Sequence, residues 1–173
     1  MVIWLIGLSG AGKTTIGRRL YEMWKAKALN TVFVDGDEIR ALFKTDASPG
    51  DYSIEGRRKN AERITELCAW LDRQDINVVC CILSLFPDMR KDNSRIFSQY
   101  FETYLRVPME ILEARDSKGL YADAAAGKIK NVVGVDIEFP VPEAPDLIVD
   151  NASDDADPER LAAEIYAAAG LSR

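Results

Sequence analysis

The segment from Gly7 to Thr15 constrains the fold of this chain more than any other part of the sequence. It matches the phosphate-binding pattern G-x-x-x-x-G-K-S/T, whose fixed positions fall on Gly7, Gly12, Lys13 and Thr14. Glycines let a backbone wrap closely around a phosphate, and the helix that follows offers unpaired N–H donors at the positive end of its dipole. In this pattern the lysine reaches the β- and γ-phosphates, and the threonine hydroxyl holds Mg²⁺.

Apolar patterns on both sides of this segment support the same interpretation. The run from Val2 to Ile6 is short and rich in β-branched residues, as in a buried parallel strand. Apolar residues then recur at helical spacing as far as Trp24. The alternative is a glycine-rich turn that matches the pattern by chance. Such a turn would not require a strand before it and a helix after it, so the segment predicts a nucleotide-binding site. The expected phosphate-binding residues are Gly7, Ser9, Gly10, Ala11, Gly12, Lys13, Thr14 and Thr15.

Composition narrows the class of protein. A chain of 173 residues suits one domain, here residues 1–173, and 47% hydrophobic residues can build a core. The formal charge of −6 argues against a general nucleic-acid or membrane-surface binder. The chain has no histidine, so a general base would have to be a carboxylate. No apolar run could span a bilayer and the N-terminus does not resemble a signal peptide, so a cytoplasmic enzyme is the default expectation.

The rest of the chain alternates between strand and helix patterns, which predicts an α/β fold with a parallel sheet flanked by helices. The expected strands are 2–6, 31–34, 77–83, 100–107 and 147–149, and the expected helices after the first are 38–43, 53–73, 89–97 and 158–169. Residues 117–139 are polar, basic and poor in apolar patterns, and a segment of this length is usually a functional lid. The pattern does not determine the order of the strands.

Polar residues that could bind a ligand or take part in catalysis follow several of the expected strands. Asp35 and Asp37 end the second strand, and Ser84 follows the third. Ligands of an open α/β sheet bind beyond the carboxyl ends of its strands, so these side chains should meet the phosphate-binding segment in one crevice. The alternative for Asp35-Gly36-Asp37 is a tight turn with solvated acids, and its place at the end of an apolar strand disfavours that alternative.

Several ordered blocks of the chain resemble the adenylylsulfate kinases, which transfer the γ-phosphoryl group of ATP to the ribose 3′-hydroxyl of adenylyl sulfate. The resemblance runs from Val2 to about Asn151. Its blocks are IWLIGLSGAGKTT from Ile3, VDGDEIR from Val34, Arg57 with Asn60, RDSKGLY from Arg115, GKIKN from Gly127 and GVD from Gly134. It implies a P-loop kinase fold with a lid, the cofactors ATP and Mg²⁺, and a small-molecule nucleotide as partner. Members of the family are commonly dimers, so it also implies a homodimer.

The resemblance assigns a role to each matching residue. Lys13 and Asp37 would be catalytic, with Asp37 orienting the attacking 3′-hydroxyl, and Asp35 would join Thr14 in supporting Mg²⁺. The acceptor would be held by Arg40, Arg57 and Asn60, since the planar guanidinium of arginine binds oxyanions bidentately. Further expected acceptor contacts are Tyr52, Ser84, Lys130 and Val132. Arg115 and Lys118 would belong to the lid that closes over ATP and excludes water.

The acceptor side departs from the family pattern while the ATP side matches it. The two phenylalanines that sandwich the adenine of adenylyl sulfate are replaced by Tyr52, which can still stack, and by Val132, which cannot. Three readings therefore stand. The first, which the overall resemblance favours, is an adenylylsulfate kinase with a variant pocket, whose product is 3′-phosphoadenylyl sulfate. The alternative is a relative such as the cytidine diphosphoramidate kinases of capsule biosynthesis. The third is a non-catalytic nucleotide-binding regulatory protein, which would need the phosphate-binding segment but not Asp37, Arg57 and Asn60 together.

Overall fold

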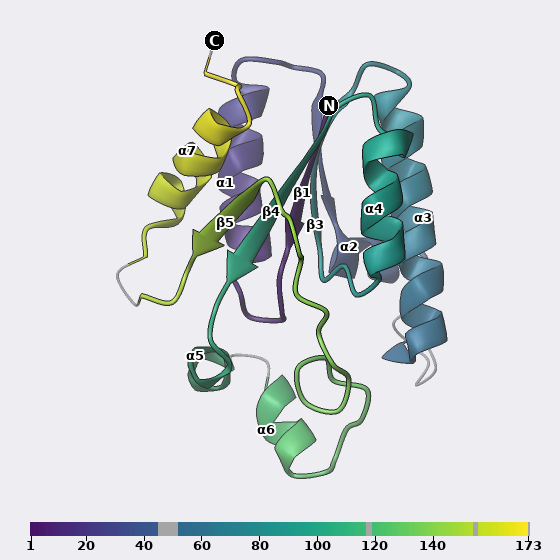
Figure 1. The fold of residues 1–173 in the computed structure, drawn as a ribbon, viewed down its shortest axis with the longest axis vertical. Helices are drawn as coiled ribbons and strands as arrows, with labels where there is room; N and C mark the ends of the chain where they lie inside the picture. The colour runs from purple at the N-terminus through teal and green to yellow at the C-terminus, as the bar shows by residue number, and fades with distance from the viewer. Residues whose placement is uncertain (45–51, 117–118, 154–155, 173) are drawn as a thin grey trace.

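A single parallel sheet organises the part of the chain that the computed structural model describes, residues 1–44, 52–116, 119–153 and 156–172. Its strands are β1 (Val2–Ile6), β2 (Thr31–Asp35), β3 (Asn77–Ile82), β4 (Tyr100–Arg106) and β5 (Leu147–Asp150). They lie in the order β2-β3-β1-β4-β5, and every neighbouring pair is parallel (Figure 1). Strand β1 is therefore paired on both edges, with Ile3 beside Val79 on one side and Phe101 on the other.

Helices cover both faces of this sheet, as the sequence predicts. They are α1 (Lys13–Lys25), α2 (Gly36–Leu42), α3 (Ile54–Asp72), α4 (Pro87–Ile96), α5 (Met109–Arg115), α6 (Leu120–Ala125) and α7 (Pro158–Ala168). Helices α1 and α7 pack on one face, where Ile16, Leu20 and Ile165 are buried with Leu5. Helices α3 and α4 lie on the other face, where Ile64 of α3 is buried (Figure 1). Each side of the sheet has its own hydrophobic core, which explains why β1, and β3 after Asn77, are apolar.

The observed bounds of most elements lie within one or two residues of the predicted ones. Helix α2 begins two residues earlier than expected, because the Asp35 side chain caps it by accepting a hydrogen bond from the Asp37 N–H. The segment 117–139 contributes more buried side chains than its composition suggests. In its described part, α6 forms and Tyr121, Val132 and Val133 are buried.

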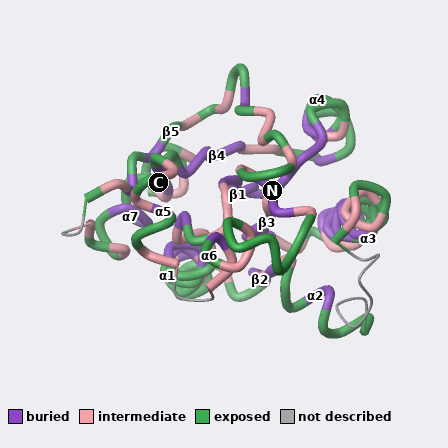
Figure 2. Tube along the Cα trace, turned by 90° about the horizontal axis from the view of Figure 1, so that it is seen from below, coloured by how far each residue is buried: buried purple, intermediate pink, exposed green. Residues whose placement is uncertain are grey.

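The carboxyl ends of the strands form one edge of the molecule, and α5 and α6 lie beyond this edge (Figure 1). In the view from that side, the central strands β1 and β3 are mostly buried, whereas the loop around α6 is largely exposed (Figure 2). No helix in the described ranges is long and apolar enough to cross a membrane.

Helix α1 lies unusually close to strand β3 at Gly17. A Cβ atom at this position would meet the Cys81 Sγ at 2.3 Å and the Phe33 ring at 3.2 Å. The Cys81 thiol also donates to the Lys13 carbonyl at 3.2 Å, which ties the first turn of α1 to the sheet. Glycine at this position therefore lets the helix that carries the phosphate-binding residues approach the sheet.

Gly17→Ala should lower the free energy of unfolding by about 1–3 kcal/mol, because the added methyl group overpacks this contact. Adding Cys81→Ala removes the sulfur atom that the methyl group meets, so the double variant should lose less stability than the two single variants together. Urea denaturation of the three variants measures this coupling. Additive losses would show that the contact between α1 and β3 adapts without cost.

Candidate active site

The phosphate-binding segment joins β1 to α1 at the centre of the carboxyl edge. Gly10 and Gly12 have φ angles of 78° and 90°, which glycine adopts without strain. The Lys13 ammonium folds back over the loop and donates to the carbonyl oxygens of Gly7 at 2.9 Å and Leu8 at 2.8 Å. The loop thus forms the expected cradle, with its lysine beside the backbone that would surround a phosphate.

Two side chains from distant parts of the chain hold this loop. Asn151, which follows β5, is buried and donates from Nδ2 to the Ala11 carbonyl at 3.0 Å. Tyr121 of α6 donates from its hydroxyl to the Ser9 carbonyl at 2.8 Å. Burial raises the pKa of Tyr121 to about 12, so its hydroxyl keeps its proton at neutral pH. Neither residue was assigned to the site from the sequence, although Tyr121 ends the RDSKGLY block that carries the resemblance.

The expected metal-binding pair is in contact. The Thr14 hydroxyl donates to Asp35 Oδ2 at 2.7 Å, and Asp35 Oδ1 accepts from the Asp37 backbone N–H at 2.9 Å. Mg²⁺ in such enzymes is usually held by one or two protein oxygens together with substrate phosphates and water. A hydroxyl and a buried carboxylate at the mouth of the phosphate-binding loop fit this requirement. Within the described ranges no group of three or more cysteine, aspartate and glutamate side chains could hold a metal by itself.

Two arginines and one tyrosine come together beside Asp37. The Arg40 and Arg57 guanidinium carbons lie 5.1 and 5.6 Å from the centre of the Tyr52 ring. Burial lowers the pKa of Arg57, and the nearby Arg40 lowers it further, while Asp37 acts in the opposite direction. Arginine nevertheless keeps its charge at neutral pH, so two adjacent cations attract an anionic ligand to this place.

Arg57 also connects the start of α3 to the segment that follows α6. Its Nε donates to the Tyr52 carbonyl at 2.9 Å, and one terminal nitrogen donates to the Asn131 carbonyl at 2.7 Å. One turn further along α3, Asn60 is buried, and its Oδ1 has no hydrogen-bond partner among the described residues. Such an acceptor costs about 1–3 kcal/mol when it is left unpaired, so a bound donor group would be favourable there.

The other expected site residues differ in how they are placed. Ser84 is buried, and its Oγ accepts a hydrogen bond from the Trp4 indole at 3.3 Å. Arg115 donates to the carbonyl oxygens of Asn151 at 2.7 Å and Ser153 at 3.1 Å, so it supports the loop behind Ala11. Lys130 is exposed. Lys118 lies outside the described residues.

Val132 is only 3% exposed and packs in the same core cluster as Ala11, Leu112 and Tyr121. Its side chain therefore presents almost no surface to a ligand in this structure. The sequence indicated that an aromatic face is missing at this position, and the structure adds that the position itself is closed. Its backbone N–H donates to the Asp136 carboxylate, which shapes the turn after it.

The parallel sheet, the central phosphate-binding loop and the Thr14–Asp35 pair define a P-loop nucleotide-binding enzyme. A family model described as Adenylylsulphate kinase matches residues 1–150. The chain therefore belongs to the adenylylsulphate kinase family, and the prediction of a nucleotide kinase is confirmed.

Relatives with two different acceptors resemble this chain. A cytidine diphosphoramidate kinase from Campylobacter jejuni is 41% identical over 151 residues, which cover 87% of this chain and 86% of the relative. An adenylyl-sulfate kinase from Halothermothrix orenii is 35% identical over 147 residues, which cover 85% of this chain and 78% of the relative. The Mycobacterium tuberculosis APS kinase CysC, solved in complex with AMPPNP and APS, superposes with a TM-score of 0.84 at 26% identity, covering 96% of this chain and 95% of that one.

Tyr121→Phe should raise the KM for the nucleoside triphosphate roughly two- to tenfold, because it removes a hydrogen bond worth about 0.5–1.5 kcal/mol that holds the loop at Ser9. Tyr166→Phe in α7, far from the loop, is the control and should leave KM unchanged. Steady-state kinetics or calorimetry with a non-hydrolysable nucleotide measures the difference. Equal KM values in the two variants would remove Tyr121 from the support of the loop.

Proposed function

We propose that this protein transfers the γ-phosphoryl group of ATP to the ribose 3′-hydroxyl of an activated nucleotide. The observation that carries the proposal is the contact between the two halves of the site. Thr14 of the phosphate-binding loop bonds to Asp35, and Asp35 caps the helix that presents Asp37. The donor phosphates and the proposed base are thereby linked through a single carboxylate.

On the donor side, backbone N–H groups from Gly7 to Thr15 and the Lys13 ammonium bind the phosphates of ATP. Phosphoryl transfer depends mainly on positioning and on neutralising charge, and these groups supply both. Thr14 and Asp35 would hold Mg²⁺, which would supply positive charge against that of the ATP phosphates. Lys118 belongs to the lid that closes over ATP, and Arg115, at the end of α5 directly before that lid, holds the loop at Asn151 and Ser153.

On the acceptor side, Asp37 is exposed at the start of α2 and accepts the proton of the 3′-hydroxyl. Arg40 and Arg57 bind the anionic groups of the acceptor, and Asn60 offers its unpaired Oδ1 to an acceptor donor group. Tyr52 stacks on the base. Ser84 and Lys130 complete the pocket from the loop after β3 and from the lid.

The segment after α5 is proposed as a lid that closes the site. In the structure it contacts both halves, because Tyr121 binds the loop at Ser9 and Asn131 accepts from Arg57. Closing this segment would exclude water, which favours transfer to the acceptor over hydrolysis of ATP. We further propose that residues 1–173 form one domain, that the protein acts in the cytoplasm and that it forms a homodimer.

The acceptor is either adenylyl sulfate or cytidine diphosphoramidate, and two observations favour the cytidine compound. The relative with 41% identity is a cytidine diphosphoramidate kinase, whereas the Halothermothrix orenii adenylyl-sulfate kinase is 35% identical. In addition, the buried Val132 leaves no second aromatic face for adenine. Losing one stacking partner costs about 1–3 kcal/mol of base binding if the value for nucleic-acid bases applies, and a smaller base loses less.

An ATP-consumption assay with Mg²⁺ should show turnover that depends on an added acceptor. We expect a higher kcat/KM with cytidine diphosphoramidate than with adenylyl sulfate at equal concentrations. A higher value with adenylyl sulfate would place the protein in sulfate activation. Slow ATP hydrolysis that neither acceptor changes would contradict the proposed reaction and favour a nucleotide-binding regulatory protein.

Asp37→Asn should lower kcat about 10²–10⁴-fold, since the base that orients the hydroxyl is lost. Lys13→Ala should lower it about 10²-fold or more, because a cation on the transferring phosphate is lost. Both proteins should stay folded by circular dichroism. Glu38→Gln, at the next exposed acid in α2, is the matched control and should keep its activity. Full activity of the Asp37 variant would remove that residue from the mechanism.

A further inference from the structure

An open hollow of about 370 Å³ lies between the loop after β3 and the C-terminal end of the proposed lid. Leu85 and Phe86 line one wall, residues 136–138 and Pro140 line the other, and Ile54 at the start of α3 lies at one end. We call it the side hollow. Its walls are mostly apolar, which suits the flat face of a nucleobase better than a phosphate group.

The side hollow is linked to Arg57, a proposed acceptor residue, through a chain of hydrogen bonds. Asp136, in its second wall, accepts hydrogen bonds from the backbone N–H groups of Asn131 and Val132. The Asn131 carbonyl in turn accepts from Arg57, and Tyr52 lies two residues before Ile54. A nucleotide whose anionic groups lie on the two arginines therefore has this hollow beside it.

Arg90 of α4 connects the two walls from behind. Its side chain is buried, with 7% of the residue exposed. One terminal nitrogen donates to the Ser84 carbonyl at 2.8 Å, directly before the first wall, and the other donates to the Pro140 carbonyl in the second wall at 3.0 Å. These carbonyls are 56 residues apart in the sequence, and a single planar guanidinium sets their separation.

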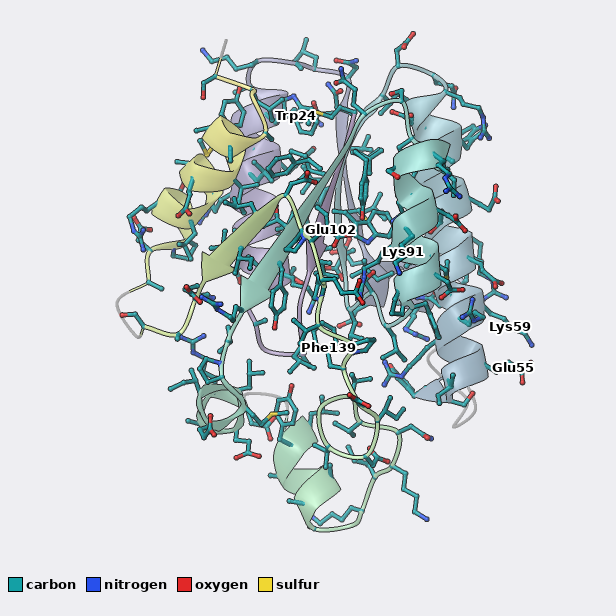
Figure 3. The ribbon with its side chains drawn as sticks, viewed as in Figure 1. Trp24, Glu55, Lys59, Lys91, Glu102 and Phe139 are labelled. Atoms are coloured by element: carbon teal, nitrogen blue, oxygen red, sulfur yellow. The ribbon has the colours of Figure 1, made fainter. Side chains whose placement is uncertain are left out.

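A buried guanidinium is costly unless a carboxylate balances its charge. Glu102 of β4 supplies that charge from the sheet side, where it also accepts from the Tyr100 hydroxyl at 2.6 Å. Burial raises the pKa of Glu102, and Arg90 opposes this rise. Figure 3 shows Glu102 between the sheet and α4, above Phe139 of the segment that enters the second wall.

Each wall also has an anchor that does not depend on Arg90. The Trp4 indole donates to the Ser84 hydroxyl at 3.3 Å, and the Phe139 ring packs 6.0 Å from the Tyr104 ring, centre to centre. The walls should therefore stay folded without the guanidinium, while the distance between them loses its constraint. Ser84 has a φ angle of 58°, which residues other than glycine rarely adopt. Contacts with its neighbours must therefore hold this backbone conformation, and with it the direction of the Ser84 carbonyl.

We propose that the side hollow receives part of the acceptor nucleotide and that Arg90 is a positioning residue that sets its width by bridging Ser84 and Pro140. The inference rests on the proposed kinase function and extends it to α4, from which the sequence assigned no residue to the site. Arg90 acts through the walls and touches neither the donor phosphates nor the reacting atoms. Its loss should therefore affect acceptor binding and spare ATP binding.

Steady-state kinetics of Arg90→Gln and Arg90→Lys test the proposal, with each substrate varied in turn. We expect the acceptor KM to rise about tenfold or more in both variants, while the KM for ATP stays within twofold of the original protein. Lysine should not rescue binding, because one ammonium group does not reproduce a planar fork between two carbonyls. Glu102→Gln, which leaves Arg90 in place without its counter-charge, should have a smaller effect in the same direction.

Arg95→Gln is the matched control, because Arg95 lies on the same helix, is exposed and pairs with Asp92 one turn before it. An unchanged acceptor KM in the Arg90 variants, or an equal rise in the KM for ATP together with a lower melting temperature, would overturn the positioning role. Absence of transfer by the original protein to either acceptor would instead overturn the proposed function itself, so the two failures are distinguishable.

Discussion

Strand β1 is hydrogen-bonded along both of its edges, and the position of every group in the site depends on this pairing. Because β3 and β4 flank it in parallel register, its carboxyl end opens at the middle of the sheet edge. The phosphate-binding loop therefore begins at the central strand and has neighbours on both sides. The Asp35 carboxylate from β2 reaches it from one side, and Asn151 reaches it from the strand at the opposite end of the sheet.

The segment after α5 is joined to both substrate sides by side chains that bond to backbone. Tyr121 binds the Ser9 carbonyl on the ATP side, and Arg57 binds the Asn131 carbonyl on the acceptor side. Backbone contacts of this kind tolerate changes in neighbouring side chains. The contacts at Ser9 and Asn131 therefore do not depend on which side chain stands at Val132.

The proposed acceptor side is built from more elements than the phosphate-binding loop. The phosphate-binding residues belong to one continuous stretch, whereas the acceptor residues come from α2, α3, the loop after β3 and the segment after α6. The buried Arg90 connects two of these segments, because it donates to the carbonyl oxygens of Ser84 and Pro140. A change of acceptor can therefore arise from residues that lie behind the pocket as well as from those that line it.

Local patterns in the sequence determined the phosphate-binding loop, the alternation of strands and helices and the identity of Asp35 and Asp37, because each depends on residues near one another in the chain. The same patterns did not reveal the strand order, since pairing is decided by contacts between segments far apart. They also missed the buried parts of residues 117–139, where isolated apolar residues such as Tyr121 find partners only in the folded chain. Only the tertiary structure showed that Val132 is closed to ligands, that Asn151 supports the loop and that Arg90 joins two walls 56 residues apart, because each of these is a contact between distant backbone segments.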